Sequence, residues 1–530
     1  MIPVALSTLV VLAALMTPRY PNAGALAARL ERAEPGLRRH GPWLVALISI
    51  AVVWFVWDAI VPIAKVHDES SYLLQADIFA RFRWTAPSPP IPEFFEQPHV
   101  LVSPAVASKY PPGHALLLSV GAFVGFPPLV PLMLTGLSAA LLFAIVTRLA
   151  NPWVALLSWV VWISTPMVLR FQPSYLSELT TAVMVLAAWW CLLEWRSSRQ
   201  PRWLYLVALA VGWGAITRPL TMLAFAIPIG VVVVRDVVRL RSWRRLAIAV
   251  GVGVAVLSIL PLWSAKTTGD WKLSPIELYR RDYLPFDKLG FTPDTSLPLR
   301  TISPPLQSTY DYYRLARQEQ RLETVPRVMS ERFVQLVIAV FQGSRLVLLP
   351  FAIAALFFMN GALAFALASA AVAFIAYLPY THWAPWTIYY LEAAPVLATL
   401  AALGIWQSLR RLHANERSIT VGMAAVVVAL AVFAVPGVLH WRLDHRQRSQ
   451  VDRSFAANLR ALPQHSIVFL RYSPRVAQHM SSVFNYPDLS AVPVWVVHDL
   501  GPRNEELRKL APDRQSFDFE EDQLVGRNRR

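Results

Sequence analysis

Long apolar stretches separated by short polar segments repeat along almost the whole chain. Most of these stretches are about 16 to 22 residues long, which is the length of a helix that crosses the hydrocarbon core of a bilayer. The apolar pattern predicts transmembrane helices at residues 2–16, 43–64, 128–148, 153–169, 175–195, 203–217, 219–234, 246–264, 340–358, 362–378, 388–407 and 418–438. Residues 114–126 form a further apolar stretch, which we interpret as a partly inserted helix. The fold class predicted is therefore an all-α polytopic membrane protein.

Composition and charge agree with that class. The chain is 55% hydrophobic and 15% charged, whereas soluble proteins carry about 25% charged residues. The formal net charge of +16 would suit a nucleic-acid partner, but the basic residues lie in short clusters between the apolar stretches. The positive-inside rule explains that distribution, so no nucleic-acid partner is expected.

The basic clusters predict the orientation. They occupy residues 19–41, 196–202, 235–245 and 410–417, and the predicted helices place all four on one face, the cytoplasmic one. The opposite face then receives the long outer loops 65–113 and 265–335 and the C-terminal region. The protein is expected in a membrane of the bacterial inner (plasma) type, with its active site on the extracytoplasmic side.

Three parts of the chain are expected. Residues 1–42 carry a short apolar helix and a basic cytoplasmic loop, and residues 43–440 form the transmembrane domain. Residues 451–530 alternate between apolar strands ("SIVFLRY", "PVWVVHD") and helices ("RVAQHMSSVF", "RNEELRKLAP"), which predicts a small extracytoplasmic α/β domain. The single cysteine, Cys191, allows no intramolecular disulfide.

Two acids stand at the outer end of the second predicted span. Asp68 and Glu69 follow the apolar run directly, and residues 69–83 have the spacing of an amphipathic helix at the membrane surface. The acids could cap that helix, because negative charge favours its first turn. They could also act in catalysis, or bind a metal ion together with His67.

The segment "SKYPPGH", residues 108–114, opens the partly inserted helix. Two prolines suit a helix start, and Lys109 lies just before it. A cation beside free backbone N–H groups favours an anion, and phosphate is the anion expected there. The simpler alternative is a lysine that extends its ammonium group to the membrane surface.

An acidic pair at the outer end of an early span, an amphipathic helix after it, and a lysine before a double proline together resemble the GT-C glycosyltransferases. These membrane enzymes, which include protein O-mannosyltransferases and aminoarabinose transferases, use polyprenyl-phosphate sugars. The resemblance covers about residues 43–440 and implies a GT-C transmembrane catalytic domain. It implies a catalytic role toward the acceptor for Asp68, with Glu69 as its neighbour, and a contact with the donor phosphate for Lys109.

Further site residues follow from the same resemblance. Arg218, in "AITRPLTML", is implied to bind the donor phosphate. The substrate-binding set is Tyr110, His114, Glu178, His382, Tyr389 and Tyr390. Two positions depart from the family pattern, because Glu178 stands where Asp is common and Ile388 stands where relatives often carry Arg.

The function expected is transfer of a sugar from a polyprenyl-phosphate or polyprenyl-diphosphate donor to an extracytoplasmic lipid, glycan or protein acceptor. A carboxylate can accept the proton of the attacking hydroxyl, and cations can stabilise the leaving phosphate. Attack opposite a single leaving group inverts the anomeric centre. The alternatives are a transporter or flippase and a non-catalytic subunit of cell-envelope assembly. No cofactor is certain from the sequence. A divalent metal is an open alternative, since His67, His99, His114 and His382 could bind one with the acids, although these histidines share no local metal-binding spacing.

Overall fold

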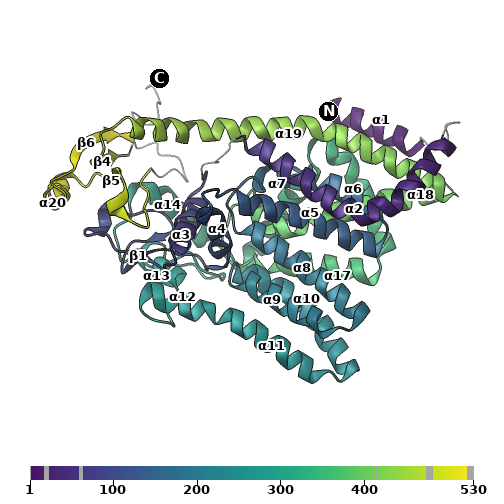
Figure 1. The fold of residues 1–530 in the computed structure, drawn as a ribbon, viewed down its shortest axis with the longest axis horizontal. Helices are drawn as coiled ribbons and strands as arrows, with labels where there is room; N and C mark the ends of the chain where they lie inside the picture. The colour runs from purple at the N-terminus through teal and green to yellow at the C-terminus, as the bar shows by residue number, and fades with distance from the viewer. Residues whose placement is uncertain (1, 17–22, 59–63, 414, 473–481, 522–530) are drawn as a thin grey trace.

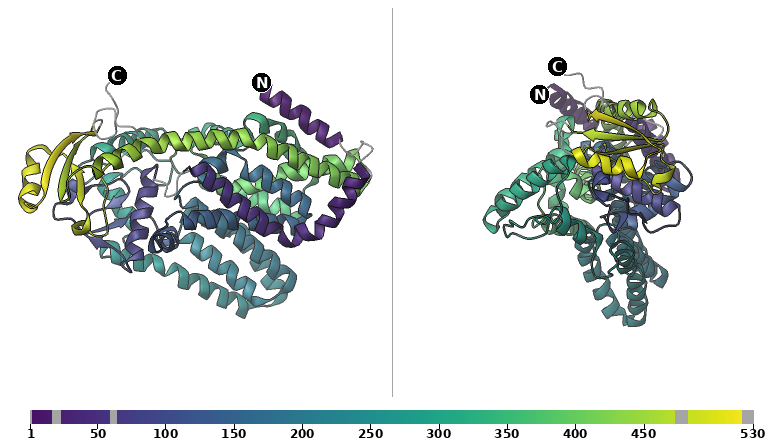
Figure 2. Two further views of the ribbon diagram at one scale, coloured as in Figure 1. Left: turned by 45° about the horizontal axis from the view of Figure 1, so that its top comes forward. Right: turned by 90° about the vertical axis from the view of Figure 1, so that its left-hand side faces the viewer.

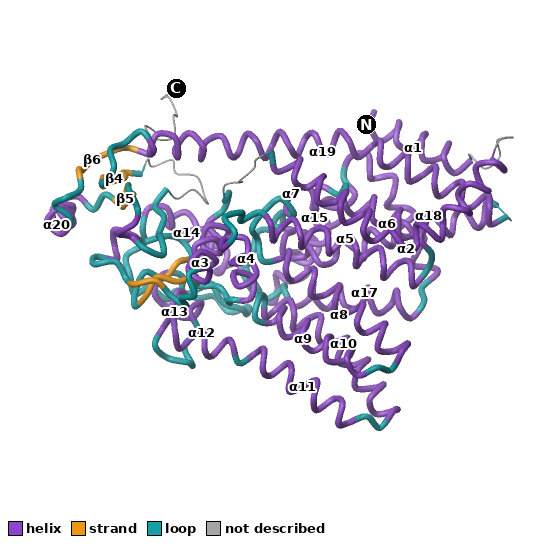
Figure 3. The backbone as a smooth tube through the Cα atoms, in the orientation of Figure 1, coloured by secondary structure: helices purple, strands orange, loops and turns teal. Residues whose placement is uncertain are grey.

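The computed structural model describes residues 2–16, 23–58, 64–413, 415–472 and 482–521. It is a helical bundle with loops and short strands gathered at one end (Figure 1, Figure 3). Within the described residues, seven helices are long and apolar enough to cross a membrane, or eight if one bent pair forms a single span. Large apolar side chains such as Leu223, Val231 and Val428 are more than 60% exposed on the outside of the bundle, where lipid would cover them. The chain is an integral membrane protein.

The long helices form the body of the bundle. They are α2 (Ala23–Trp57), α5 (Leu129–Leu149), α8 (Glu178–Ser198), α10 (Pro219–Leu240), α11 (Trp243–Leu257) with α12 (Ile259–Thr268), α18 (Ala394–Leu412) and α19 (Glu416–Arg460). Shorter helices complete it: α1 (Ile2–Met16), α6 (Pro152–Ile163), α7 (Pro166–Phe171), α9 (Pro201–Ala215) and α17 (Gly361–Ala376). Gly404 allows α18 to approach α16 (Leu349–Ala355), because a Cβ there would lie 1.8 Å from the carbonyl oxygen of Phe351.

Several predicted boundaries differ from the structure; for example, the predicted span 153–169 is divided between α6 and α7. The basic segment before the second span is mostly helical rather than a loop, and α2 continues through Pro35 and Pro42. The intervening residues are mainly strong helix formers, which explains the continuity. The predicted span 340–358 is a bent pair, in which Leu322–Phe341 and Gly343–Phe358 meet at 103°. This pair contains α15 (Val325–Phe341), the 3-10 turns η4 (Gly343–Leu348) and η5 (Leu356–Phe358), and α16.

The end of the bundle that carries the loops is ordered. Helix α3 (His67–Ala80) lies against α4 (Gly113–Phe123), and a small antiparallel sheet packs beside them. The sheet has the order β1-β3-β2, with β1 (Ala86–Pro87), β2 (Val100–Leu101) and β3 (Ala105–Ser108). Helices α13 (Pro275–Tyr283) and α14 (Pro304–Glu319) cover this end. Both faces of α3 contain buried residues, so it is enclosed by protein rather than lying with one face on lipid.

A second, parallel sheet lies at the C-terminal end of the chain. Its order is β5-β4-β6, with β4 (Ser466–Arg471), β5 (Val494–His498) and β6 (Gln515–Glu520), and α20 (Asn504–Leu510) follows β5. These elements match the predicted strands and the second predicted helix, whereas most of "RVAQHMSSVF" lies outside the described residues. Helix α19 runs without a break from the bundle to this sheet (Figure 1, Figure 2).

Candidate active site

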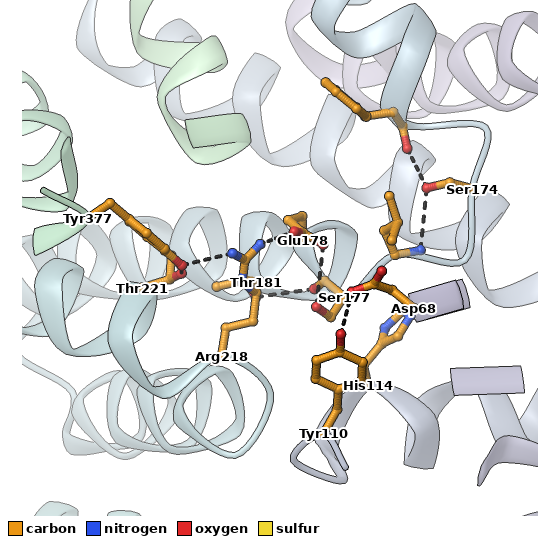
Figure 4. Close-up of polar contacts among 12 residues, drawn as sticks. Asp68, Tyr110, His114, Ser174, Ser177, Glu178, Thr181, Arg218, Thr221 and Tyr377 are labelled. Carbon is orange, nitrogen blue, oxygen red and sulfur yellow. Dashed lines mark hydrogen bonds and ion pairs between the residues drawn. The ribbon is translucent and has the colours of Figure 1, made fainter. Parts of the chain in front are cut away.

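Asp68 lies in the first turn of α3, and its side chain is one-third exposed. The phenol of Tyr110 donates a hydrogen bond of 2.5 Å to its Oδ1 atom (Figure 4). Its Oδ2 atom lies 3.7 Å from Nε2 of His99. The carboxylate is therefore oriented by a tyrosine while it keeps an accessible edge.

Lys109 follows strand β3 directly, and its position is fixed by the backbone of His99, the residue before β2. Its N–H donates to the carbonyl oxygen of His99 at 3.0 Å. Its ammonium group is buried 3.9 Å from Asp287 and lies 4.7 Å from the ring centre of Tyr279. Burial lowers the pKa of Lys109, while the negative charges of Asp287 and Asp68 act in the opposite direction.

A second group of charges lies at the starts of α8 and α10. Glu178 and Arg218 form a buried ion pair. Arg218 also donates to the phenol of Tyr377 at 2.8 Å, and that phenol lies 2.5 Å from the hydroxyl of Thr221 (Figure 4). Since Arg218 is the residue before α10, the first turn of that helix places the guanidinium against the first turn of α8.

Tyr72 joins the two groups. Its ring stacks on Tyr110 with 4.8 Å between centroids, and its hydroxyl donates to Ser177 at 2.9 Å. Ser177 in turn donates to Glu178 at 3.4 Å. The charge of Asp68 acts on both Lys109 and Glu178. Four of the predicted residues, Asp68, Lys109, Glu178 and Arg218, thus gather in one polar region at the loop-bearing end of the bundle.

Residues 382–390, which precede α18, place aromatic side chains beside this region. The ring of Tyr389 lies 5.5 Å from the guanidinium of Arg218 and 4.6 Å from the ring of His382. Nε2 of His382 lies 3.1 Å from the hydroxyl of Tyr390. Burial, with the nearby charge of Arg332, lowers the pKa of His382 to about 3, so the imidazole is neutral at physiological pH.

Two other predicted residues point elsewhere. Glu69 accepts hydrogen bonds from the backbone N–H groups of Lys65 and Tyr175, at 3.3 and 3.0 Å. Burial raises the pKa of Glu69 to about 7. His114 lies within hydrogen-bond distance, 2.8 Å, of both Thr180 and the carbonyl oxygen of Tyr175. Both side chains tie the loop before α8 to the rest of the site.

Several residues that complete the site were absent from the predicted set. They are Tyr72, His99, Tyr279, Asp287, Tyr377 and Glu392. Glu392 is 3% exposed, and neither of its carboxylate oxygens has a hydrogen-bond partner, although the charge of Arg218 acts on it. The sequence did contain a signal for Glu392. It is a lone acid inside the apolar segment "YYLEAAP", and acids within membrane segments are usually functional. Tyr377 carries no such signal, since aromatic residues are ordinary in a membrane helix.

The described residues contain no candidate metal-binding site. Among those residues, no three His, Cys, Asp or Glu side chains come together in a way that could hold a metal ion.

Comparison with known proteins supports the fold. Residues 111–264, from just before α4 into α12, match the model of a family described as dolichyl-phosphate-mannose-protein mannosyltransferase. The apo crystal structure of ArnT from Cupriavidus metallidurans is similar over 90% of this chain and 89% of that one, with 17% identity and a TM-score of 0.50. The chain has the GT-C fold.

Two further solved structures give lower TM-scores. ArnT bound to undecaprenyl phosphate gives a TM-score of 0.49 with 15% identity over 90% of each chain. The oligosaccharyltransferase of Archaeoglobus fulgidus gives 0.45 with 13% identity, over 80% of this chain and 58% of that one. No curated protein matches the sequence.

Proposed function

We propose that this GT-C protein is a membrane glycosyltransferase that moves a sugar from a polyprenyl-phosphate or polyprenyl-diphosphate donor to an extracytoplasmic acceptor. The observation that carries the proposal is the gathering of Asp68, Lys109, Glu178 and Arg218 at one end of the bundle. The description of the family that matches residues 111–264 names a sugar linked to a lipid phosphate. That description supports the lipid-linked donor.

Asp68 is the base in this proposal. A base must reach the hydroxyl proton of the acceptor, and the carboxylate of Asp68 is partly exposed, unlike the buried carboxylate of Glu69. The short hydrogen bond from Tyr110 holds one oxygen of Asp68, which directs the other toward the acceptor. The proton passes from the hydroxyl to the carboxylate while the hydroxyl oxygen bonds to the anomeric carbon.

Lys109 and Arg218 hold the donor phosphate. The bond between the anomeric carbon and the phosphate oxygen breaks, and its electron pair stays on the phosphate, so negative charge grows there. Cations that are fixed before the donor binds stabilise this charge without reorganising. Lys109 is fixed by the His99 carbonyl through its backbone and by Asp287 through its side chain, while Glu178 and Tyr377 orient Arg218.

Inversion at the anomeric carbon completes the proposal. A retaining two-step reaction needs a carboxylate positioned as a nucleophile opposite the leaving group. Here Glu178 is paired with Arg218, and Glu69 bonds to backbone N–H groups, whereas Asp68 keeps an accessible edge and is already assigned as the base. In this proposal the loop-bearing end lies outside the cytoplasm, an orientation that the distribution of basic segments supports, and the acceptor there is a lipid, glycan or protein.

The test combines genetics and reconstitution. Lipids, polysaccharides and glycoproteins of a strain lacking the protein are compared with those of its parent, to find the missing sugar. The purified protein in nanodiscs is then given that sugar on a polyprenyl phosphate together with the acceptor. Transfer by the native protein and its loss in Asp68→Asn support the proposal. Glycans unchanged in the deletion strain, or full transfer by Asp68→Asn, would overturn it.

A further inference from the structure

A cavity of about 380 Å³ lies inside the bundle, away from the candidate active site. It is lined by residues of α5, α8, α10, α17 and α18, mainly leucine, isoleucine and valine with Trp189 and Phe365. Ligand sites in proteins measure about 300–1,000 Å³ and are mostly apolar with a few polar groups at defined places. The cavity therefore has the size and lining of a site for an apolar chain.

The charged groups of this cavity lie at one end. Arg196 and Arg235 line it, and they belong to the last parts of α8 and α10. The same two helices carry Glu178 and Arg218 at their beginnings. Eighteen residues of α-helix span about 27 Å, so the two arginines mark the opposite membrane face from the candidate active site.

Positive charge is in excess at this end. Asp236 is buried, and its carboxylate lies 3.0 Å from Arg196, 3.4 Å from Arg199 and 3.6 Å from Arg235. One negative charge thus faces three positive ones. Helix α17 also begins here, with Asn360 capping the N–H of Leu363, and a helix N-terminus adds partial positive charge. Arg196 and Arg235 keep 43% and 51% of their side-chain surface exposed, so both can reach a further anion.

We propose that this cavity binds one anionic glycerophospholipid from the cytoplasmic leaflet. One acyl chain occupies the apolar cavity, and the headgroup phosphate lies against Arg196 and Arg235. Basic pockets between membrane helices on the cytoplasmic side are sites for anionic lipid headgroups. The donor lipid is a separate ligand, because its phosphate is assigned to Arg218 at the other end of α10. This inference does not rest on the proposed function, since lipid binding is measured without sugar transfer.

Two variants and a matched control test the site in the purified full-length protein. Arg196→Gln with Arg235→Gln removes the headgroup contacts. Ala366→Phe fills the cavity, because Ala366 lines it. Ala368→Phe adds the same ring two residues away on the exposed side of α17 and serves as the control. Native mass spectrometry and thermal unfolding are recorded with added phosphatidylglycerol, phosphatidylcholine or polyprenyl phosphate.

The native protein is expected to retain one phosphatidylglycerol in preference to phosphatidylcholine and to unfold at a higher temperature with it. The double arginine variant should bind phosphatidylglycerol about 30-fold more weakly, since each arginine near an anionic lipid contributes roughly one kilocalorie per mole. Ala366→Phe should lose retention of the lipid, and Ala368→Phe should keep it. Equal binding of the two phospholipids by the native protein would overturn the proposal. Unchanged binding in Ala366→Phe, or a preference for polyprenyl phosphate that Ala366→Phe removes, would do so as well.

Discussion

The backbone N–H of Lys109 donates a 3.0 Å hydrogen bond to the carbonyl oxygen of His99, so the lysine assigned to the donor phosphate is held by a residue that also faces Asp68. His99 has a φ of 65°, in the left-handed region that residues with a Cβ seldom adopt. Its own N–H donates to the phenol of Tyr279 at 2.9 Å, and Tyr279 lies beneath the ammonium group of Lys109. The backbone of His99 thus fixes the lysine from two sides.

Substitutions at His99 separate its backbone from its imidazole. Glycine and asparagine tolerate a positive φ, whereas alanine in that conformation costs about 1–2 kcal/mol. We expect His99→Ala to unfold at a lower temperature than His99→Gly and to bind the donor more weakly than His99→Asn. Thermal unfolding and the KM for the donor measure the two effects. Equal stability of His99→Ala and His99→Gly would show that the strained backbone conformation is unimportant.

Asp68→Asn should reduce the kcat of sugar transfer by about 10²–10⁴-fold, because the amide cannot accept the hydroxyl proton. Donor binding should change little, since Asp68 faces the acceptor. Tyr110→Phe should give a smaller loss, because it removes the 2.5 Å hydrogen bond and keeps the carboxylate. Single-turnover rates and donor binding are measured on protein of equal membrane abundance. A Tyr110→Phe defect as large as that of Asp68→Asn would contradict the division of roles.

Lys109→Met should weaken donor binding and lower kcat/KM. The single variant leaves Asp287 buried without its cation, so it should also be less stable. Lys109→Met combined with Asp287→Asn should recover the melting temperature without recovering donor binding. Lys272→Met removes a lysine charge from an exposed position in the outer loop 265–335, so it is the control for charge alone. Recovery of donor binding in the double variant would mean that Lys109 serves only to neutralise Asp287.

The pH dependence of stability should report on Glu96, at the contact between the outer loops and the C-terminal sheet. Its carboxylate accepts a hydrogen bond from Tyr283 at 3.1 Å, and His498 donates to its carbonyl oxygen at 2.6 Å. Burial raises the pKa of Glu96 from 4.5 to about 7. The neutral form stabilises the fold, so this contribution is complete below about pH 4.5 and is lost as the pH rises through 7. The melting temperature of the native protein relative to Glu96→Gln should therefore fall between pH 5 and pH 7.5.

Glu93→Gln serves as the comparison for that experiment, because the side chain of Glu93 is 47% exposed on the same loop. It should show the same pH profile as the native protein. A difference between native protein and Glu96→Gln that stays constant with pH would exclude Glu96 as the titrating group.

The sequence was sufficient for the class of fold and for the charged centre of the site. Apolar length predicts membrane helices directly, and Asp68, Lys109 and Arg218 are charged groups next to the ends of apolar stretches. The aromatic residues around them could not be predicted from the sequence. Tyr72 and Tyr377 belong to the site because of contacts between segments that are distant in the chain. Glu69 illustrates the same difficulty. Its place beside Asp68 in the chain suggests a shared role, whereas one helical residue step turns its side chain toward Tyr175.

Helix α19 extends as one element from Glu416 to Arg460, a length of about 68 Å. Its last turns belong to the core of the C-terminal sheet, where Phe455 packs with Val468 and Leu470. That sheet holds the loop of Glu96, which leads to His99 three residues later. This single helix therefore connects the transmembrane bundle to the sheet that holds the loop beside the candidate active site. Its orientation is set by packing against α1, α2 and α6, so contacts deep in the bundle also determine where the C-terminal sheet and the loop leading to His99 lie.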